Sequence, residues 1–422
     1  MMRFDYFLSI LKTNRLKTNS KDIKKGDIFV AIRQGNSYLQ EAIQNGASVV
    51  VYDSEKIFCD FKNSYKVENS IEFLQKLAKK YRETLNTKII GITGSNGKTT
   101  TKDIIYEILS LNKIGKKTEG NLNNHIGVPI TILGLEEKDE FAVIEMGMSN
   151  LGEIDLLADI VKPEYSIITN IGDSHLEFLK NRKNIFKAKS EIINHTRNRL
   201  FINGDDEYLK KLSGIKIGFG KSNDLSARNI IFNEEYSTYL LKCDLGEFNV
   251  KLNLVGEHNI LNSMFGIAIG LEFGYTINEI LDRIANIKIS KMRFEKIKRG
   301  DTIFINDAYN ASPISTKYSL KTFSKLYEDR LKIVILADML ELGEKSRKLH
   351  EDLSDNIMDT KADIFIFYGN EMKYLYKKVL KDKRAYYFEN KKDIIKLINE
   401  LSGKKAILLK GSRGMKLEEI IC

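Results

Sequence analysis

Residues 91–103, which read GITGSNGKTTTKD, combine glycines, a lysine and threonines in a spacing that suits a phosphate group. A glycine-rich turn that leads from a strand into a helix presents several backbone N–H groups to one anion. Gly94 and Gly97 would allow the tight turn, because glycine tolerates a positive φ. Lys98 would contact the β- and γ-phosphates of a nucleotide, and Thr99 would offer its hydroxyl to Mg²⁺. The segment therefore predicts a nucleotide-binding loop rather than a glycine-rich turn with an incidental lysine.

This loop is shorter than the commonest phosphate-binding loop. The usual pattern has four residues between its first glycine and the Gly-Lys pair, which would place that glycine at Ile92. In this chain the first glycine of the turn is Gly94 instead. The shortened spacing indicates a class of nucleotide-using enzymes whose phosphate-binding loop differs from the commonest kind.

A carboxylate and an imidazole follow the next two buried-strand patterns. Glu145 ends the apolar run FAVIE, and His175 follows the run YSII within the segment TNIGDSH. Because the carboxyl ends of parallel strands face the ligand side of a sheet, Glu145 is a candidate Mg²⁺ ligand, directly or through a neighbouring group. A strand-end glutamate can also face solvent, and a lone histidine more often has a structural role. Both alternatives stay open from the spacing alone.

Lys189 occupies an unusual position in the helical segment RKNIFKAKSEIINH (182–195). The apolar face of this helix is formed at steps i, i+3, i+7 and i+8 by Ile185, Ala188, Ile192 and Ile193. Lys189 stands at i+4 on the same face, whereas Lys183 and Lys187 lie elsewhere. A lysine that points inward has its pKa lowered by desolvation, so it can be neutral and can add CO₂ to form a metal-binding carbamate. The alternative is a lysine whose ammonium reaches solvent from the edge of the core.

Alternating strand and helix patterns must position these residues. From residue 88 onward, apolar strand runs alternate with amphipathic helical patterns, which is typical of a parallel sheet covered on both faces. Residues 226–255 have the period-2 pattern of a hairpin, and a long helix is expected from about His258. The pattern starts again at KMRFEKIKRG (291–300) with five further strand runs, which predicts a second doubly wound domain.

We therefore expect an α/β protein of three domains. A small N-terminal α/β domain (1–85) contains the strand-like runs 28–32 and 48–53 and ends in a helix at about 69–85. A central domain (86–295) carries a mostly parallel, P-loop-type sheet, and a Rossmann-like domain (296–422) follows. The segment 290–300 is the expected hinge.

The composition excludes several other classes of protein. The chain has 422 residues, of which 42% are hydrophobic and 29% charged, and it contains no apolar run of about 20 residues that would predict an integral membrane segment. Its net charge of +10 comes from lysines spread along the chain, without a basic run interleaved with aromatics, so we expect no nucleic-acid partner. Three scattered cysteines and a weakly apolar start predict a cytoplasmic protein. We expect a monomer.

The chain resembles the Mur ligases, the ATP-dependent amide-forming enzymes of cell-wall precursor synthesis. The resemblance rests on the shortened loop TGSNGKTT and on motifs in the order of the family: NLNNHIGVP (121–129), EMGMSNLGEI (145–154), TNIGDSHLE (169–177), KAKSEI (187–192), GEHNILN (256–262), RFE (293–295), NDAYNASP (306–313), ADMLELGEKSRKLH (337–350) and KGSRGMKLE (410–418). Within the family, NNHIGVP, DAYNASP, DMLELG and KGSRGM are most similar to the members that add D-alanyl-D-alanine to UDP-N-acetylmuramoyl-tripeptide (UDP-MurNAc-tripeptide).

The resemblance implies a role for each matching residue. It implies that ATP is bound by Gly94, Ser95, Asn96, Gly97, Lys98, Thr99, Thr100, Asn259, Asn262, Asp307 and Asn310. The implied Mg²⁺ ligands are Thr99, Glu145, His175 and carbamylated Lys189, and the implied substrate-binding residues are Ser20, Asn123 and Asn124. Lys98, Lys189, His175 and Arg293 are the implied catalytic residues.

The implied reaction forms a carbon–nitrogen bond between an acid and a D-amino acid. ATP phosphorylates the tripeptide carboxylate to an acyl phosphate, the dipeptide amine attacks it, and ADP and phosphate are released. Two Mg²⁺ ions, Lys98 and Arg293 would screen the repulsion between the carboxylate and the γ-phosphate. Closure of the third domain would exclude water from the acyl phosphate.

Four other functions compete with this hypothesis. A sibling Mur-type ligase would add a single amino acid to a UDP-MurNAc-peptide, and a related enzyme would add glutamates to folate. A P-loop ATPase that drives motion would lack the metal carbamate and would hydrolyse ATP without a carboxylate acceptor. A non-catalytic binding module is disfavoured because every expected catalytic position is filled. NDAYNASP (306–313) argues against the first two alternatives.

Overall fold

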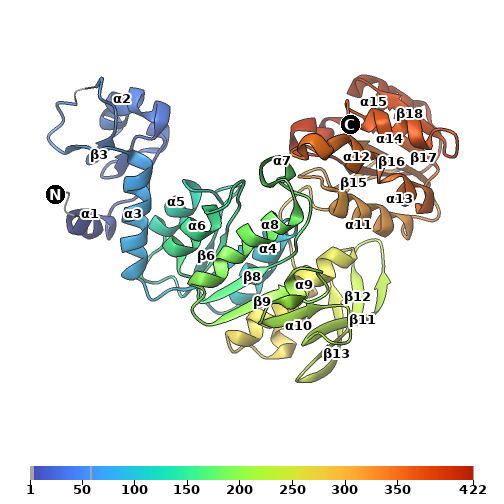
Figure 1. Ribbon diagram of the computed structural model, residues 1–422, viewed down its shortest axis with the longest axis horizontal. Helices are drawn as coiled ribbons and strands as arrows, with labels where there is room; N and C mark the ends of the chain where they lie inside the picture. Colours follow the sequence, from blue (N-terminus) through green and yellow to red (C-terminus); the bar gives the residue numbers. More distant parts are fainter. Residues whose placement is uncertain (1–3, 58, 422) are drawn as a thin grey trace.

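The computed structural model describes residues 4–57 and 59–421, and it contains three α/β units that are each built on a separate β-sheet (Figure 1). The sheets have four, nine and six strands in chain order. In Figure 1 the first and third units stand at the two ends of the central one, so the molecule has an open V shape. The predicted three-domain α/β fold is confirmed.

The N-terminal unit contains a four-stranded, entirely parallel sheet in the order β1-β2-β3-β4. Its strands are β1 (Leu16–Lys17), β2 (Ile28–Val30), β3 (Val49–Tyr52) and β4 (Ser64–Lys66), and its helices are α1 (Phe4–Leu11), α2 (Leu39–Gln44) and α3 (Ser70–Glu83). The side chain of Asn69 accepts hydrogen bonds from the backbone N–H groups of Ile71 and Glu72, which explains where α3 begins. The sequence analysis identified β2 and β3, which are apolar and fully buried, but not β1 (LK) and β4 (SYK), which contain no buried apolar run.

Helix α3 joins the N-terminal unit to the central one. Phe73 and Leu77 of this helix belong to a core that includes Phe7 from the first unit and Val128 from the second. Buried Arg82 donates hydrogen bonds to the carbonyl oxygens of Val161, Leu85 and Thr87, so the end of the helix is also anchored to the central unit. The predicted boundary at 85/86 therefore divides the chain between two sheets that share one hydrophobic core.

The central unit contains a nine-stranded sheet in the order β13-β12-β11-β10-β9-β8-β5-β7-β6. Its strands are β5 (Lys88–Thr93), β6 (Gly115–Lys117), β7 (Phe141–Glu145), β8 (Tyr165–Ile168), β9 (Arg199–Asn203), β10 (Ile215–Gly218), β11 (Leu225–Phe232), β12 (Ser237–Cys243) and β13 (Gly246–Leu252). Only β12 pairs in antiparallel fashion with its neighbours β11 and β13, which confirms both the mostly parallel sheet and the predicted hairpin. The helices are α4 (Lys98–Leu109), α5 (Gly127–Leu133), α6 (Glu153–Val161), α7 (Leu176–Leu179), α8 (Arg182–Ser190), α9 (Glu257–Glu272) and α10 (Ile277–Ile284).

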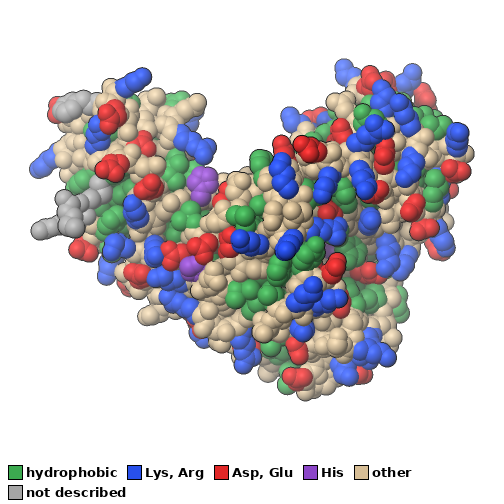
Figure 2. Space-filling view, in the orientation of Figure 1, with side chains coloured by type: hydrophobic (Ala, Val, Ile, Leu, Met, Phe, Trp, Pro, Cys, Tyr) green, Lys and Arg blue, Asp and Glu red, His purple; other side chains and the backbone are tan. Residues whose placement is uncertain are grey.

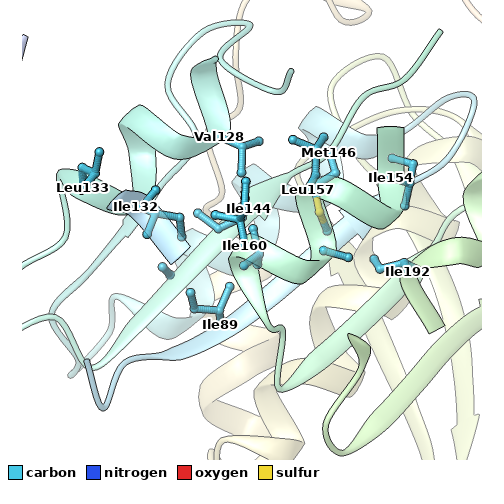
Figure 3. Close-up of a cluster of buried hydrophobic side chains, with 14 of the residues drawn as sticks. Ile89, Val128, Ile132, Leu133, Ile144, Met146, Ile154, Leu157, Ile160 and Ile192 are labelled. Carbon is cyan, nitrogen blue, oxygen red and sulfur yellow. The ribbon is translucent and has the colours of Figure 1, made fainter. Parts of the chain in front are cut away.

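Successive side chains of β5 pack on opposite faces of this sheet. Ile89 packs with α5 and α6 (Figure 3), whereas Ile90 and Ile92 pack with α4 and α9 on the other face. Burial of each of these isoleucines contributes about 1.5–3 kcal/mol. This two-sided burial fixes the register of β5, which lies between β7 and β8, so the carboxyl ends of three neighbouring strands meet at one edge.

The C-terminal unit contains a six-stranded sheet in the order β14-β15-β19-β16-β17-β18. Its strands are β14 (Glu295–Arg299), β15 (Thr302–Asn306), β16 (Leu331–Ala337), β17 (Ile364–Tyr368), β18 (Ala385–Phe388) and β19 (Lys405–Lys410). All pairs are parallel except β14 with β15. Helices cover both faces: α11 (Pro313–Ser324), α12 (Ser346–Glu351), α13 (Ser354–Asp359), α14 (Met372–Val379) and α15 (Lys391–Glu400).

Strand β14 changes the expected position of the hinge. The segment 290–300 was expected to be a free linker, but residues 295–299 pair with β15 as an edge strand of the C-terminal sheet. Only the residues between Ala285, which is the C-cap of α10, and Glu295 connect the two units outside regular structure. The connection available for a hinge is therefore the segment 286–294.

Basic and acidic side chains are interspersed on the face of the molecule that Figure 2 shows. On the face in Figure 2, Lys and Arg side chains alternate with Asp and Glu over all three units and do not gather into one stripe. Among the residues that the structure describes, no helix has the length and apolar character needed to cross a bilayer.

Candidate active site

A cavity of about 640 Å³ lies at the edge where β5, β7 and β8 end, between the central and C-terminal units. Most of the predicted site residues line it: Ser95, Asn96, Gly97, Lys98, Thr99, Thr100, Asn123, Asn124, Glu145, His175, Asn259, Asn262, Arg293, Asp307 and Asn310. Three predicted residues are not part of its lining. Gly94 lies in the adjoining turn, Lys189 is buried, and Ser20 belongs to the N-terminal unit, where its hydroxyl donates to Glu41.

The turn after β5 requires both of its glycines. Gly94 and Gly97 have φ values of +147° and +84°. A Cβ atom on Gly94 would lie 1.9 Å from Thr169 Oγ1, and one on Gly97 would lie 2.6 Å from Asn262 Oδ1. Gly97 is also the N-cap residue of α4, whose first N–H groups and positive dipole end face the cavity. The geometry is that of an anion-binding turn, as predicted.

Lys98 extends back over this turn. Its Nζ donates a hydrogen bond of 2.7 Å to the carbonyl oxygen of Gly94. Burial lowers the pKa of Lys98; the negative charge of Glu145 opposes this shift, and the positive charge of Arg293 adds to it. A cation in such a poorly solvated position interacts strongly with a phosphate, since little water competes for it.

Thr99 and Glu145, two of the predicted metal ligands, are in direct contact. Thr99 Oγ1 donates to Glu145 Oε2 at 2.9 Å, and Asn123 Nδ2 donates to Glu145 Oε1 at 2.9 Å. Glu145 is buried at the end of β7. A hydroxyl oxygen beside a carboxylate at the mouth of a phosphate-binding turn is a donor set that suits Mg²⁺.

The structure confirms that Lys189 points inward. Its side chain is 1% exposed and packs on the same side of α8 as Ile185 and Ala188, whereas Lys183 and Lys187 are exposed. Burial lowers the pKa of Lys189 well below its usual value, and the nearby positive charge of Lys98 adds to this effect. Within the described residues, its amino group forms no hydrogen bond or ion pair. Burial and the charge of Lys98 therefore both favour the neutral form of this amine.

His175 reaches the cavity from the loop that precedes α7. Its Nδ1 atom lies 2.9 Å from Oε2 of Glu341, a residue of the C-terminal unit. Glu341 belongs to the motif at 337–350, but the sequence analysis gave it no role. In the described ranges, 4–57 and 59–421, no three His, Cys, Asp or Glu side chains group closely enough to hold a metal by themselves.

Several polar atoms at the far end of the cavity are buried without a partner within the described residues. Asn259 Nδ2 donates to the carbonyl oxygen of Val255, but Asn262 Nδ2, His258 Nδ1 and Arg293 Nε have no hydrogen-bond partner. Burial lowers the pKa of His258 to about 4, so this imidazole is neutral near pH 7. Unpaired buried donors and acceptors are costly, and a polar ligand such as a nucleotide would satisfy them.

The C-terminal unit contributes a cationic wall. The guanidinium of Arg293 stacks over the ring of Tyr309 at 4.3 Å. Buried Lys410 lies 3.0 Å from Asp307 Oδ2 and donates to the carbonyl oxygen of Asn310 at 2.6 Å. The sequence analysis assigned no role to Tyr309 or Lys410. The strand-end rule that identified Glu145 could have identified Lys410, because it ends the apolar run of β19.

A hydrogen bond and a close approach of backbone to side chain join the C-terminal unit to the phosphate-binding turn and its surroundings. Ser312 Oγ, at the N-cap of α11, donates to Asn96 Oδ1 at 3.0 Å. A Cβ atom on Gly172 would lie 3.3 Å from Ile314 Cδ1. The cavity therefore depends on how the two units dock.

Asn124 has a different role from the other predicted substrate-binding residues, since its side-chain oxygen accepts hydrogen bonds from the N–H groups of Ile126 and Gly127 at the start of α5.

The chain is similar to known proteins along almost its whole length. Family models described as "Mur ligase middle domain" and "Mur ligase, glutamate ligase domain" match residues 92–270 and 292–413. The chain is 36% identical to the UDP-N-acetylmuramoyl-tripeptide–D-alanyl-D-alanine ligase of Bacillus subtilis, over 96% of this chain and 91% of that protein. It is 34% identical to the enzyme of the same name from Rickettsia prowazekii, over 97% of this chain and 94% of that protein.

Solved structures agree with the sequence relatives. The crystal structure of MurF from Acinetobacter baumannii superposes with a TM-score of 0.87 at 28% identity, over 96% of this chain and 92% of that one. MurF from Thermotoga maritima in complex with ADP gives a TM-score of 0.87 at 28% identity, over 97% of both chains.

Proposed function

This chain belongs to the Mur ligase family, and from that premise we propose that it joins D-alanyl-D-alanine to UDP-MurNAc-tripeptide. It is an ATP-dependent carbon–nitrogen ligase that releases ADP and phosphate and forms the pentapeptide precursor of peptidoglycan. The main support is one cavity that is lined both by the phosphate-binding turn after β5 and by Arg293, Asp307 and Asn310 near or within the C-terminal unit.

The chemistry needs two anions to approach each other. The tripeptide carboxylate attacks the γ-phosphorus of ATP, ADP leaves, and an acyl phosphate remains. The dipeptide amine then attacks the acyl carbon, and phosphate leaves from the tetrahedral intermediate. Lys98 and Arg293 place two positive charges at this cavity, and their fixed positions stabilise charge that develops on the transferred group.

The donor set fits bound Mg²⁺. Thr99 and Glu145 would hold one ion beside the phosphates, and His175 with the carbamate of Lys189 would hold a second. The ions would supply Lewis-acid polarisation and charge neutralisation at the phosphoryl group. Addition of CO₂ to the neutral amine of Lys189 releases one proton and gives an anion, which Lys98 would attract rather than repel. This change explains why a lysine without partners is buried at that position.

The outer units would hold the two other substrates. We propose that the N-terminal unit, with Ser20, binds the UDP end of the acceptor, while Asn123 and Asn124 contact the acceptor at the cavity wall. The C-terminal unit would bring D-alanyl-D-alanine. We further propose that the protein works as a monomer in the cytoplasm.

Product analysis tests this function. The chain is incubated with UDP-MurNAc-tripeptide, D-alanyl-D-alanine and ATP, and we expect a pentapeptide by mass spectrometry with one phosphate released per product. Omission of either the acceptor or the dipeptide is the control and should abolish phosphate release. Turnover of a shorter acceptor with a single amino acid would instead identify a sibling ligase, and phosphate release without an acceptor would identify an ATPase.

A further inference from the structure

Two loops from different units clasp each other at the edge of the cavity. The clasp consists of residues 175–180 of the central unit and residues 341–345 of the C-terminal unit. The N–H of Glu177 donates to the carbonyl oxygen of Glu341 at 3.3 Å, and Lys345 Nζ donates to the carbonyl oxygen of Lys180 at 3.4 Å. Figure 1 shows α7 on the side of the central unit that faces the C-terminal unit.

The clasp is close and depends on unusual backbone geometry. Gly343 has a φ of +58°, and a Cβ atom there would lie 2.8 Å from the Cα of Glu177. His175 and Glu341 both have a φ of +64°, although neither is glycine. Residues other than glycine adopt this conformation only when their surroundings hold them there, and such positions are concentrated at functional sites.

Within the clasp, the two ring nitrogens of His175 have different environments. Nδ1 is buried and lies 2.9 Å from Glu341 Oε2, in ion-pair contact rather than in a well-aligned hydrogen bond. Nε2 forms no hydrogen bond within the described residues, and the side chain lines the cavity. A carboxylate beside Nδ1 favours a proton on that atom, which leaves the lone pair on Nε2.

Stability does not explain the contact. The Glu341 side chain is 54% exposed, and an exposed pair of this kind adds little to the free energy of folding. The contact instead places a carboxylate beside His175, the imidazole at the cavity that the proposed function uses as a metal ligand. Metal-binding histidines commonly donate their other ring N–H to a carboxylate, which fixes the tautomer and orientation of the ring.

We propose that Glu341 is a positioning residue that completes the second metal site when the C-terminal unit docks: its carboxylate lies beside Nδ1 of His175 and favours a proton there, so that Nε2 is free to bind the ion. This inference rests on the proposed function, because it takes His175 as a ligand. The Ser312–Asn96 hydrogen bond also joins the C-terminal unit to the phosphate-binding turn. The docked C-terminal unit therefore contacts both the proposed second metal site and the phosphate-binding turn.

The first test reads the tautomer directly and needs no ligand. The chain has five histidines, so ¹⁵N-histidine labelling gives a simple spectrum, and His175→Asn assigns the resonance. In the ligand-free full chain we expect His175 in the Nδ1–H form. Glu341→Gln should move it toward the Nε2–H form that free imidazole prefers. The control is Glu400→Gln, which removes an exposed acid at the end of α15, outside the clasp, whose side chain forms no ion pair or hydrogen bond within the described residues, and it should leave the spectrum unchanged.

The second test measures ligation. Loss of a partner behind a metal-binding histidine typically costs about 10- to 100-fold, so Glu341→Gln should lower kcat by that factor while Glu400→Gln retains wild-type turnover. An Nε2–H tautomer in the wild type, a tautomer that Glu341→Gln does not change, or a changed tautomer with normal kcat would each overturn the proposal. If the wild type fails to ligate but shows the expected tautomers, the proposed function is wrong, whereas the effect of Glu341 on the His175 tautomer is confirmed.

Discussion

At the scale of single residues, two lysines distinguish this cavity from an ordinary nucleotide pocket. Lys98 extends over the phosphate-binding turn, and Lys189 lies buried near it without a partner in the described part of the chain. Burial and mutual repulsion both disfavour a proton on Lys189. Because such a side chain lowers stability, we propose that it occupies the core for the chemistry that it would perform as a metal-binding carbamate.

Replacement of Lys189 by methionine should separate stability from activity. Because the folded-state pKa of Lys189 lies below its usual 10.5, the unfolded chain binds the extra proton between the two values, and the folded state loses stability as the pH falls from 10.5 toward the folded pKa. In CO₂-free buffer at pH 7, Lys189→Met should therefore raise the melting temperature, by about 2–4 °C for each kcal/mol recovered. Ligation should be nearly absent.

Exposed Lys187 on the same helix provides the matched control. Lys187→Met should change neither the melting temperature nor turnover. Lys189→Ala should be nearly inactive and partly rescued by a short carboxylic acid, which can replace the carbamate oxygens. Full activity of either Lys189 variant, or a melting temperature that falls in Lys189→Met, would contradict this account.

At the scale of elements, helix α4 organises the site. Its N-terminus receives the phosphate-binding turn, and Asp103 on the same helix accepts hydrogen bonds from the N–H and hydroxyl of Ser290 in the connecting segment. Helix α4 therefore fixes both the phosphate-binding turn and the connecting segment, 286–294, that carries Arg293.

The geometry of the turn predicts the effect of a single added methyl group. Gly94→Ala should weaken ATP binding by at least about 100-fold, because the new Cβ atom would overlap Thr169 Oγ1, and the strained φ adds further cost. Gly120→Ala is the control, since Gly120 also has a positive φ but, apart from its chain neighbours, no atom of the described residues lies within 4 Å of its Cβ position. Calorimetric titration with ATP analogue compares the two. Equal affinity in both variants would show that the turn does not hold the phosphates.

At the scale of the whole molecule, three sheets are arranged so that the catalytic cavity is shared between two of them. The long apolar runs and the residues at strand ends, such as Glu145, could be predicted because each is a local pattern. The Glu341–His175 and Ser312–Asn96 contacts could not, since they join residues more than 160 positions apart. Strand β14 was missed because its sequence, EKIKR, is an exposed edge strand that lacks a buried apolar run.

The connecting segment links the two units mechanically. Ser290→Ala removes one hydrogen bond to Asp103, worth about 0.5–1.5 kcal/mol, so residues 286–294 should exchange their amide hydrogens faster and kcat should fall about 2- to 10-fold. Hydrogen–deuterium exchange by mass spectrometry measures the first effect and steady-state kinetics the second. Unchanged exchange in this segment would show that Asp103 does not anchor it.

The central claim is that ATP phosphorylates the tripeptide carboxylate within this cavity. The direct test uses UDP-MurNAc-tripeptide with ¹⁸O in that carboxylate, together with ATP and D-alanyl-D-alanine, and analyses the released phosphate by mass spectrometry. Our account predicts one ¹⁸O atom in each phosphate, since the acyl-phosphate oxygen leaves with phosphorus. Phosphate that carries no ¹⁸O while the pentapeptide accumulates would contradict it.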